Sequence, residues 1–194
     1  MSKEKEMKFN KKHLSIVGYG NNRQEKDFYP TPESTTKALL DREKFNGLIW
    51  ECASGNGDMV NTILKYTPNK VIASDIRKDV YGDGDIDFLK CNKKVDNIIT
   101  NPPYRYAKEF VLHAKKCATK KIAMLLKLVF LEGIGRYEMF QDKEFPLKNV
   151  YIFCRRQKIY KDGIIGKNSG LIAYAWFVFD KTYVGEPTIK WISD

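Results

Sequence analysis

The stretch Leu48-Ile-Trp-Glu-Cys-Ala-Ser-Gly-Asn-Gly57 decides the fold of this chain. It opens with a short apolar run of the kind that forms a buried strand. It closes on Gly55 and Gly57, and glycines let the backbone turn sharply and approach a ligand closely. Residues 58–66 follow with apolar side chains at helical spacing. A strand, a glycine turn and a helix in this order predict an α/β unit with a binding site at the carboxyl end of the strand.

The same alternation of strands and helices continues outward from this unit. Helices are expected at 33–44 and 106–118, and strands at 71–75, 86–88, 95–100 and 121–130. Two later stretches, 149–154 and 171–180, are strand-like and predict an antiparallel hairpin, with residues 155–170 between them as a projecting loop. We therefore expect an α/β protein whose sheet is mostly parallel, is covered on both faces and ends in an antiparallel hairpin.

Length and charge suggest one domain and a polyanionic partner. The 194 residues fit a single domain, which we place at 27–194, after a flexible basic N-terminal arm at 1–26. The chain carries 34 Lys and Arg against 24 Asp and Glu, for a net charge of +10. Such an excess favours nucleic acid through steering and counterion release.

Several other classes of protein are disfavoured by the sequence. No apolar run approaches the ~20 residues that span a bilayer, and the N-terminus lacks the apolar core of a secretory signal. A cytoplasmic protein without a membrane partner is therefore expected. The four cysteines are far apart with no C-x-x-C pair, and only two histidines occur, so no metal site is expected.

Acidic residues follow two of the predicted strands. Glu51 precedes the glycine turn, where a carboxylate would repel a phosphate and suits a cationic group such as the amino group of a methionine moiety. Asp75 ends the next strand, about twenty residues after the turn, where a carboxylate can accept hydrogen bonds from ribose hydroxyls. The turn lacks the G-x-G-x-x-G spacing that cradles pyrophosphate, which disfavours a nicotinamide-dependent dehydrogenase.

The motif Asn101-Pro-Pro-Tyr104 stands directly after the strand expected at 95–100. Prolines fix the backbone and have no N–H to donate, so carbonyl groups at this point can be aimed outward. Asn101 adds a side-chain acceptor and Tyr104 an aromatic face. Together these groups predict a clamp for a planar group that carries an NH2.

These motifs resemble those of the amino-group methyltransferases with a D/N-P-P-Y/F sequence, and among them the phage and bacterial DNA N6-adenine methyltransferases. Asp27-Phe-Tyr-Pro-Thr-Pro32 is similar to the family's N-terminal cofactor segment, and Phe130-Leu-Glu-Gly133 and Tyr174-Ala-Trp-Phe-Val-Phe179 are similar to segments of its small phage members. The likeness covers residues 27–192 and follows the family's gamma order. It implies a Rossmann-like class I methyltransferase fold, and location in the host cytoplasm if the chain is phage-encoded. The chain departs from the family in one respect, because we expect no separate target-recognition domain beside the catalytic domain at 27–194.

The resemblance also implies the cofactor, S-adenosyl-L-methionine, and the residues that bind it. Glu51, Ala53, Gly55 and Gly57 would surround the methionine part, and Tyr29 and Thr31 would close over it. Asp75 would hold the ribose, Asp87 would accept from the adenine amino group, and Ile76 and Phe88 would sandwich the adenine ring, with Asn101 beside the cofactor.

The catalytic residues implied by the resemblance are Asn101, Pro102, Pro103 and Tyr104. Asn101 and the carbonyl group of Pro102 would accept the two amino hydrogens of an adenine that is flipped out or unpaired. Tyr104 would stack on that base, and catalysis would rest on positioning and electrostatics without a metal.

A basic loop is the expected contact with the nucleic acid backbone. Its cations are interleaved with an aromatic side chain, a pattern that suits a nucleic-acid groove, and a solvated charged hairpin is the alternative. The substrate-binding residues expected here, besides Tyr104, are Arg155, Arg156, Lys158, Tyr160 and Lys161.

Other functions remain open at this point. The clamp recognises an NH2 group and not a whole substrate, so methylation of RNA or of a protein glutamine is an alternative. A non-catalytic, regulatory S-adenosylmethionine-binding module is a second alternative, although the complete motif at 101–104 argues against it.

Overall fold

The computed structural model describes residues 29–159 and 172–193 of the chain. The arm expected at 1–26, and Tyr160 and Lys161 of the expected basic loop, lie outside the described residues.

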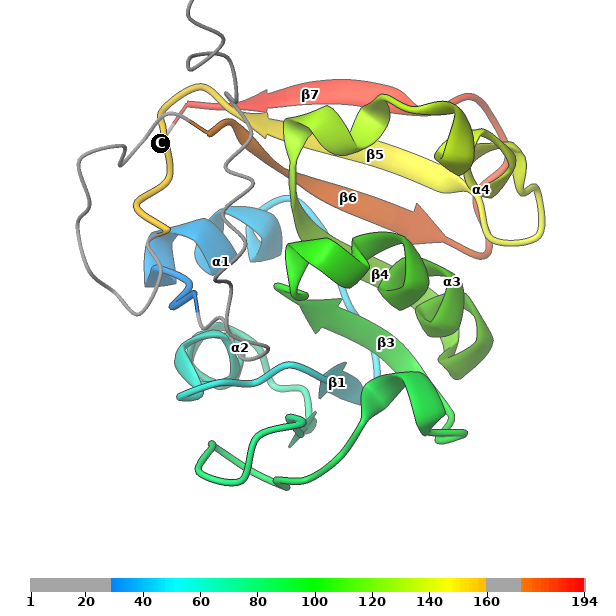
Figure 1. Cartoon of the computed structure of the whole chain (residues 1–194). Helices are drawn as coiled ribbons and strands as arrows, with labels where there is room; N and C mark the ends of the chain where they lie inside the picture. Colours follow the sequence, from blue (N-terminus) through cyan, green and yellow to red (C-terminus); the bar gives the residue numbers. More distant parts are fainter. Residues whose placement is uncertain (1–28, 160–171, 194) are drawn as a thin grey trace, which may run out of the picture.

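Seven strands form one sheet with the order β2-β1-β3-β4-β6-β5-β7 (Figure 1). Only β6 runs antiparallel to its neighbours, between β4 and β5, so that the other six strands are parallel to one another. The strands are β1 (Ile49–Glu51), β2 (Val71–Ala73), β3 (Val95–Thr100), β4 (Ala118–Lys127), β5 (Leu147–Phe153), β6 (Tyr174–Asp180) and β7 (Thr188–Ile192). The mostly parallel sheet with an antiparallel C-terminal part is confirmed.

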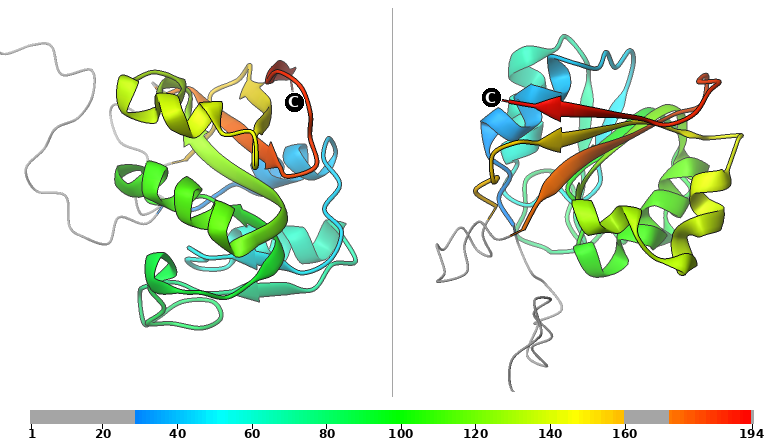
Figure 2. Two further views of the ribbon diagram at one scale, coloured as in Figure 1. Left: turned by 90° about the vertical axis from the view of Figure 1, so that its right-hand side faces the viewer. Right: turned by 90° about the horizontal axis from the view of Figure 1, so that it is seen from above.

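Helices cover both faces of the sheet, as Figure 2 shows from the side and from above. Alternate residues of β4 enter two separate apolar cores: Ile122 and Met124 pack on one face, Ala123 and Leu125 on the other. The first core also takes side chains from α3 (Ala107–Cys117) and α4 (Tyr137–Gln141), and the second takes side chains from α1 (Glu33–Leu40) and α2 (Asp58–Tyr66). The sheet is therefore buried on both sides over its central strands.

Short 3-10 helices follow several of these elements, and their bounds are η1 (Phe88–Lys90), η2 (Tyr104–Tyr106), η3 (Leu128–Leu131) and η4 (Ile134–Arg136). No helix within 29–159 or 172–193 has the length and apolar character needed to cross a bilayer.

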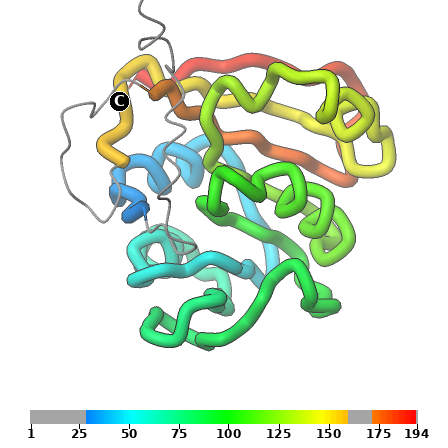
Figure 3. The backbone as a smooth tube through the Cα atoms, viewed as in Figure 1, coloured from blue at the N-terminus to red at the C-terminus, as the bar shows by residue number. Residues whose placement is uncertain are grey.

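The strand directions place the functional motifs at one edge of the sheet. β1, β2, β3, β4 and β5 are parallel, so the segments that follow them all leave from the same edge. The backbone tube in Figure 3 can be followed through each of these exits. Five segments therefore share this edge: the glycine turn, Asp75, the motif at 101–104, η3 and residues 155–159 after β5.

Three sequence predictions of secondary structure are wrong. No strand forms at 86–88: Ile86 bonds back to Asp75, and the Asp87 side chain accepts from the Leu89 N–H to begin the 3-10 helix η1. The first helix ends at Leu40 and not at 44, and the strand expected at 121–130 covers 118–127, because 128–131 turn into η3.

The edge strand β7 was not predicted from the sequence. All its residues but Ile192 are exposed, so the apolar side chains that alternate along it, Ile189 and Trp191, do not enter a core. It is held by parallel pairing with β5.

A buried acid ties the first helix segment to the far edge of the sheet. The Glu43 carboxylate accepts from Asn149 Nδ2 at 2.6 Å, from the Tyr151 hydroxyl at 2.9 Å and from Lys121 Nζ at 2.8 Å. Burial would raise the pKa of Glu43, but the hydrogen bond and charge of Lys121 outweigh burial and lower it. Its stabilising effect is therefore present above the pKa of the unfolded chain and is lost as the pH falls through the folded pKa.

Replacing Glu43 by Ala is expected to lower the free energy of unfolding by about 3 kcal/mol, since Lys121 and two polar side chains lose their buried partner. Urea unfolding at pH 7 measures the effect, and Glu33→Ala is the control because Glu33 pairs with Lys65 on the surface. Equal unfolding midpoints for the two variants would contradict this role of Glu43.

Candidate active site

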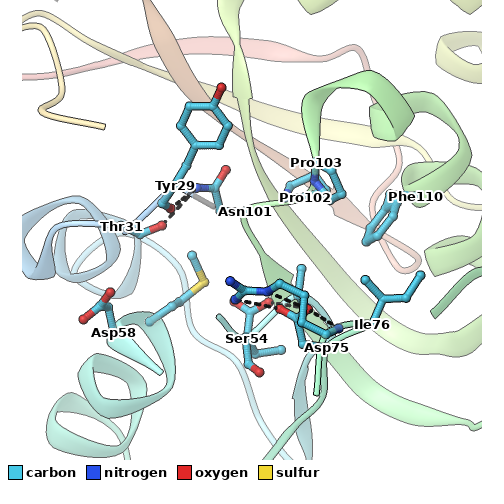
Figure 4. Close-up of a pocket in the computed structure, with 14 residues that line it drawn as sticks. Tyr29, Thr31, Ser54, Asp58, Asp75, Ile76, Asn101, Pro102, Pro103 and Phe110 are labelled. Atoms are coloured by element: carbon cyan, nitrogen blue, oxygen red, sulfur yellow. Dashed lines mark hydrogen bonds and ion pairs between the residues drawn. The ribbon is translucent and has the colours of Figure 1, made fainter. Parts of the chain in front are cut away.

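A pocket opens at the carboxyl edge of the sheet (Figure 4). It is bounded by the segments after β1, β2 and β3, by α2 and α3, and by the segment before α1. The residues that line it are Tyr29, Thr31, Glu51, Ala53, Ser54, Asp58, Met59, Asp75, Ile76, Arg77, Asn101, Pro102, Pro103 and Phe110. Residues predicted from four separate motifs of the sequence thus surround one pocket.

The glycine turn lies next to this pocket, which Ala53 and Ser54 of the same segment line. Gly57 has φ of +88°, and a Cβ there would meet the Tyr81 ring at 2.5 Å, so only glycine fits. The Ser54 hydroxyl donates to the Tyr81 carbonyl oxygen at 2.7 Å, which holds the turn against the segment after β2. Gly55 and Gly57 shape the site through the backbone and do not themselves line the pocket.

Glu51 is a buried acid at the end of β1. Its Oε1 accepts from Thr100 Oγ1 at 2.5 Å and from the Ala53 N–H at 2.9 Å. Burial, together with the nearby Asp75, outweighs these hydrogen bonds and raises the pKa of Glu51 to about 8. A cationic group bound beside Glu51 would favour its ionised form.

Asp75 is also buried and faces the same pocket. Its Oδ2 accepts from the Gly55 N–H at 2.9 Å, and its Oδ1 accepts from the Arg77 N–H at 2.9 Å. The Arg77 guanidinium lies against the same carboxylate, with Nε at 3.2 Å from Oδ1. A ligand with vicinal hydroxyl groups would therefore have to compete with the Arg77 side chain.

The motif at 101–104 holds one polar side chain in a fixed direction. Asn101 Nδ2 donates to Thr31 Oγ1 at 3.1 Å and to the Tyr29 carbonyl oxygen at 3.3 Å, as the dashed lines in Figure 4 mark. Its Oδ1 is buried and has no hydrogen-bond partner among the described residues. A buried acceptor without a partner is costly, and a donor supplied by a ligand would satisfy it.

The Tyr104 ring stands among aromatic neighbours. Its centroid lies 5.5 Å from that of Tyr29 and 5.6 Å from that of Tyr174, with Lys127 Nζ at 5.0 Å. The buried Tyr104 hydroxyl lacks a well-formed hydrogen bond within the described part of the chain. Burial, followed by the neighbouring Tyr174, raises the pKa of Tyr104 well above its usual range, so the phenol is neutral.

Tyr104 lines a second pocket instead of the first. Its other walls come from the start of α3, the end of β4 and the segment after β4: Ala107, Leu126, Lys127, Val129, Phe130 and Arg136. The N-P-P-Y loop therefore contributes to both pockets, with Pro102 and Pro103 in the first and Tyr104 in the second.

Besides Gly55 and Gly57, two more predicted cofactor residues, Asp87 and Phe88, do not line the first pocket. Phe88 is buried between Trp50, Phe110 and His113, with ring centroids 4.9–5.2 Å apart, and Asp87 caps η1 and pairs with Lys90. Phe110 lines the pocket near Ile76. The sequence analysis missed Phe110 because its place on the apolar face of a helix is equally typical of a core residue.

The described cations of the basic loop lie at the same edge as the pocket. Arg155, Arg156 and Lys158 are exposed after the end of β5. Lys158 also lines a groove beside the pocket together with Thr31 and Asp58, which border the pocket itself. In the described ranges no three His, Cys, Asp or Glu side chains are grouped so that they could hold a metal ion.

No protein-family model and no curated protein sequence matches the chain. Solved structures with a similar fold include a modification subunit of a putative type I restriction enzyme from Vibrio vulnificus (TM-score 0.62, 12% identity, 86% of this chain and 47% of that one). A second is a putative RNA methyltransferase from Pyrococcus horikoshii (TM-score 0.58, 16% identity, 80% of this chain and 87% of that one). A third is a putative hemolysin from Lactococcus lactis (TM-score 0.57, 12% identity, 82% of this chain and 91% of that one).

This chain spans about half the length of that modification subunit. At such identities the likeness shows the fold alone, and one fold hosts many activities. The fold is a Rossmann-like α/β fold, which this chain shares with these structures.

Replacing Glu51 by Gln is expected to stabilise the protein free of ligand at alkaline pH. The folded pKa of about 8 lies above the ordinary value of 4.5, so wild-type stability falls as the pH rises between these values. The stability gained by the variant should be about 4 kcal/mol larger at pH 9 than at pH 5, which thermal unfolding at both pH values measures. A difference that does not grow with pH would contradict the burial of an ionisable Glu51; Glu132→Gln, on the surface, is the control.

Proposed function

We propose that this protein transfers the methyl group of S-adenosylmethionine to the N6 amino group of adenine in DNA. The observation that carries the proposal is the Oδ1 of Asn101, a buried acceptor without a partner among the described residues, in an Asn-Pro-Pro-Tyr loop at the mouth of an acid-lined pocket. An incoming amino group would supply the missing donor.

The residues of the first pocket fit S-adenosylmethionine. Glu51 would receive the cationic amino group, and Asp75 would accept from the ribose hydroxyls once the Arg77 side chain withdraws. Ile76 and Phe110 offer apolar walls for the adenine ring, so Phe110 takes the role that the sequence analysis gave to Phe88. When bound, the cofactor would supply an electrophilic methyl group on a sulfonium.

The chain's own residues would orient the amino group that receives the methyl. Asn101 Oδ1 and the carbonyl oxygen of Pro102 would accept its two hydrogens and direct the nitrogen lone pair toward the pocket. Because Thr31 and Tyr29 hold Asn101 Nδ2, the side-chain amide is fixed in orientation, and its Oδ1 has no partner among the described residues. The Tyr104 ring would stack on the base.

Charge supports a nucleic acid as the substrate. Arg155, Arg156 and Lys158 are exposed at the pocket edge, and the whole chain has a net charge of +10. The choice of DNA rests on the resemblance of the N-P-P-Y sequence and its flanking segments to the DNA N6-adenine enzymes. RNA and protein glutamine are the alternatives that the assay must separate.

The proposed activity predicts labelled N6-methyladenine after incubation with unmethylated DNA and radiolabelled S-adenosylmethionine. Asn101→Ala should lower the rate by about a thousandfold, because it removes one of the acceptors that orient the amino group, while cofactor affinity stays within about threefold. Asn101→Asp keeps an acceptor oxygen and should retain more activity than the Ala variant.

Parallel samples of total RNA and cell protein complete this assay. If only RNA or protein is labelled, the protein is a methyltransferase whose substrate is not DNA. If the protein binds the cofactor but labels no sample, it is not a methyltransferase, and a regulatory binding module is favoured.

Replacing Asp75 by Asn should weaken binding of S-adenosylmethionine and S-adenosylhomocysteine by about tenfold, since a neutral amide holds ribose hydroxyls less strongly than a carboxylate does. Isothermal titration measures both ligands. The matched control is Asp79→Asn in the same segment, because Asp79 is exposed and does not line the pocket. Equal losses in the two variants would argue against ribose binding by Asp75.

A further inference from the structure

The segment after β4 exposes an unusual set of apolar side chains. We call residues 128–137 the β4 lip. Val129, Leu131, Ile134 and Tyr137 are all exposed there, and Ile134 is exposed to 91%. Single exposed apolar residues are common on proteins, but four within ten residues concentrate apolar surface in one segment, and concentrated apolar surface marks interaction sites.

The lip is held in a defined shape by Arg136. Its Nε donates to the Phe130 carbonyl oxygen at 2.8 Å, and its guanidinium lies 5.0 Å from the centroid of the Phe130 ring. Gly133, with φ of +115°, makes the turn between them, where a Cβ would meet Arg136 Nη2 at 2.8 Å. Ile134 is therefore presented to solvent by a braced turn.

The lip stands beside the N-P-P-Y loop. β3 and β4 are parallel neighbours, so the segments that follow them leave the sheet side by side. The second pocket shows this contact directly, because Tyr104 forms one wall and Val129, Phe130 and Arg136 of the lip form another.

The charges at this place suit a polyanion. The charged side chains that line the second pocket, Lys127 and Arg136, are both cations. Glu132 and Glu138, the acids of this region, are exposed and do not line it. Proteins that insert between stacked bases do so with exposed apolar side chains, and nearby cations bind the adjoining phosphates. The β4 lip has both kinds of side chain beside the proposed site for the base.

We propose that the β4 lip is a wedge that enters the base stack of duplex DNA, with Ile134 at its tip filling the space left by the flipped adenine. The inference rests on the proposed function. The wedge would lower the free energy needed to extrude the base from the duplex. This free energy is a few kcal/mol in a duplex and is smallest for an unpaired base. A wedge therefore matters for duplex DNA and not for single strands.

Methylation of native and heat-denatured samples of one unmethylated chromosomal DNA tests the wedge. Ile134→Ser should lower label incorporation into native DNA by about tenfold and into denatured DNA by less than about twofold. Val184→Ser is the matched control, since Val184 is 95% exposed in the segment after β6, at the opposite edge of the sheet. It should leave both rates unchanged.

Each other outcome overturns the wedge and can be told apart from failure of the proposed function. Equal losses on both DNA forms would make Ile134 a general contact, and no loss would remove it from DNA binding. If the wild-type protein labels only denatured DNA, the proposed function is supported and the wedge is contradicted. If it labels neither form, the proposed function is contradicted, and the wedge with it.

Discussion

The hydrogen bond from Thr100 Oγ1 to Glu51 Oε1, at 2.5 Å, joins the last residues of β3 and β1. Through it, the acid of the glycine turn and the strand that leads into the N-P-P-Y motif are held at one edge of the sheet. Parallel pairing of β1 with β3, and of β3 with β4, sets the directions that make this contact possible. Without that register, the glycine turn at 51–57 and the motif at 101–104 would not meet at one edge of the sheet.

The pocket concentrates groups that a purely structural site would avoid. Glu51 is a buried acid whose pKa is raised to about 8, and Asn101 Oδ1 is a buried acceptor without a partner in the described part of the protein. Each is a cost to the folded chain that a bound ligand with matching donors would offset. The Glu43 cluster shows the opposite arrangement, in which each buried polar group finds a partner, as expected of a structural network.

The sequence predicted the parts of the molecule whose signal is local. The glycine turn, Asp75 and the N-P-P-Y motif each follow a strand, so the fold class and the gathering of these residues at one edge could be read from the chain. Phe110 could not be predicted, because an apolar position on a helix is equally typical of a core residue. The strand β7 could not be predicted either, because it is short and is held by pairing with β5 and not by burial of its own apolar side chains. The stretch 86–88 has strand-like residues, but Asp87 bonds to the local backbone and starts a 3-10 helix instead. The arrangement of the β4 lip depends on Arg136 bonding back to the Phe130 carbonyl oxygen, a local contact without a sequence signature.

The central claim is that the side-chain oxygen of Asn101 positions an adenine amino group for methyl transfer. Nucleoside mass spectrometry of DNA from a methylation-deficient bacterium that expresses this chain, or its Asn101→Ala variant, tests that claim most directly. The account predicts N6-methyladenine in DNA with the wild-type chain and none with the variant at equal protein levels. N6-methyladenine at the same level with both proteins, or none with a folded wild-type protein that binds S-adenosylmethionine, would contradict it.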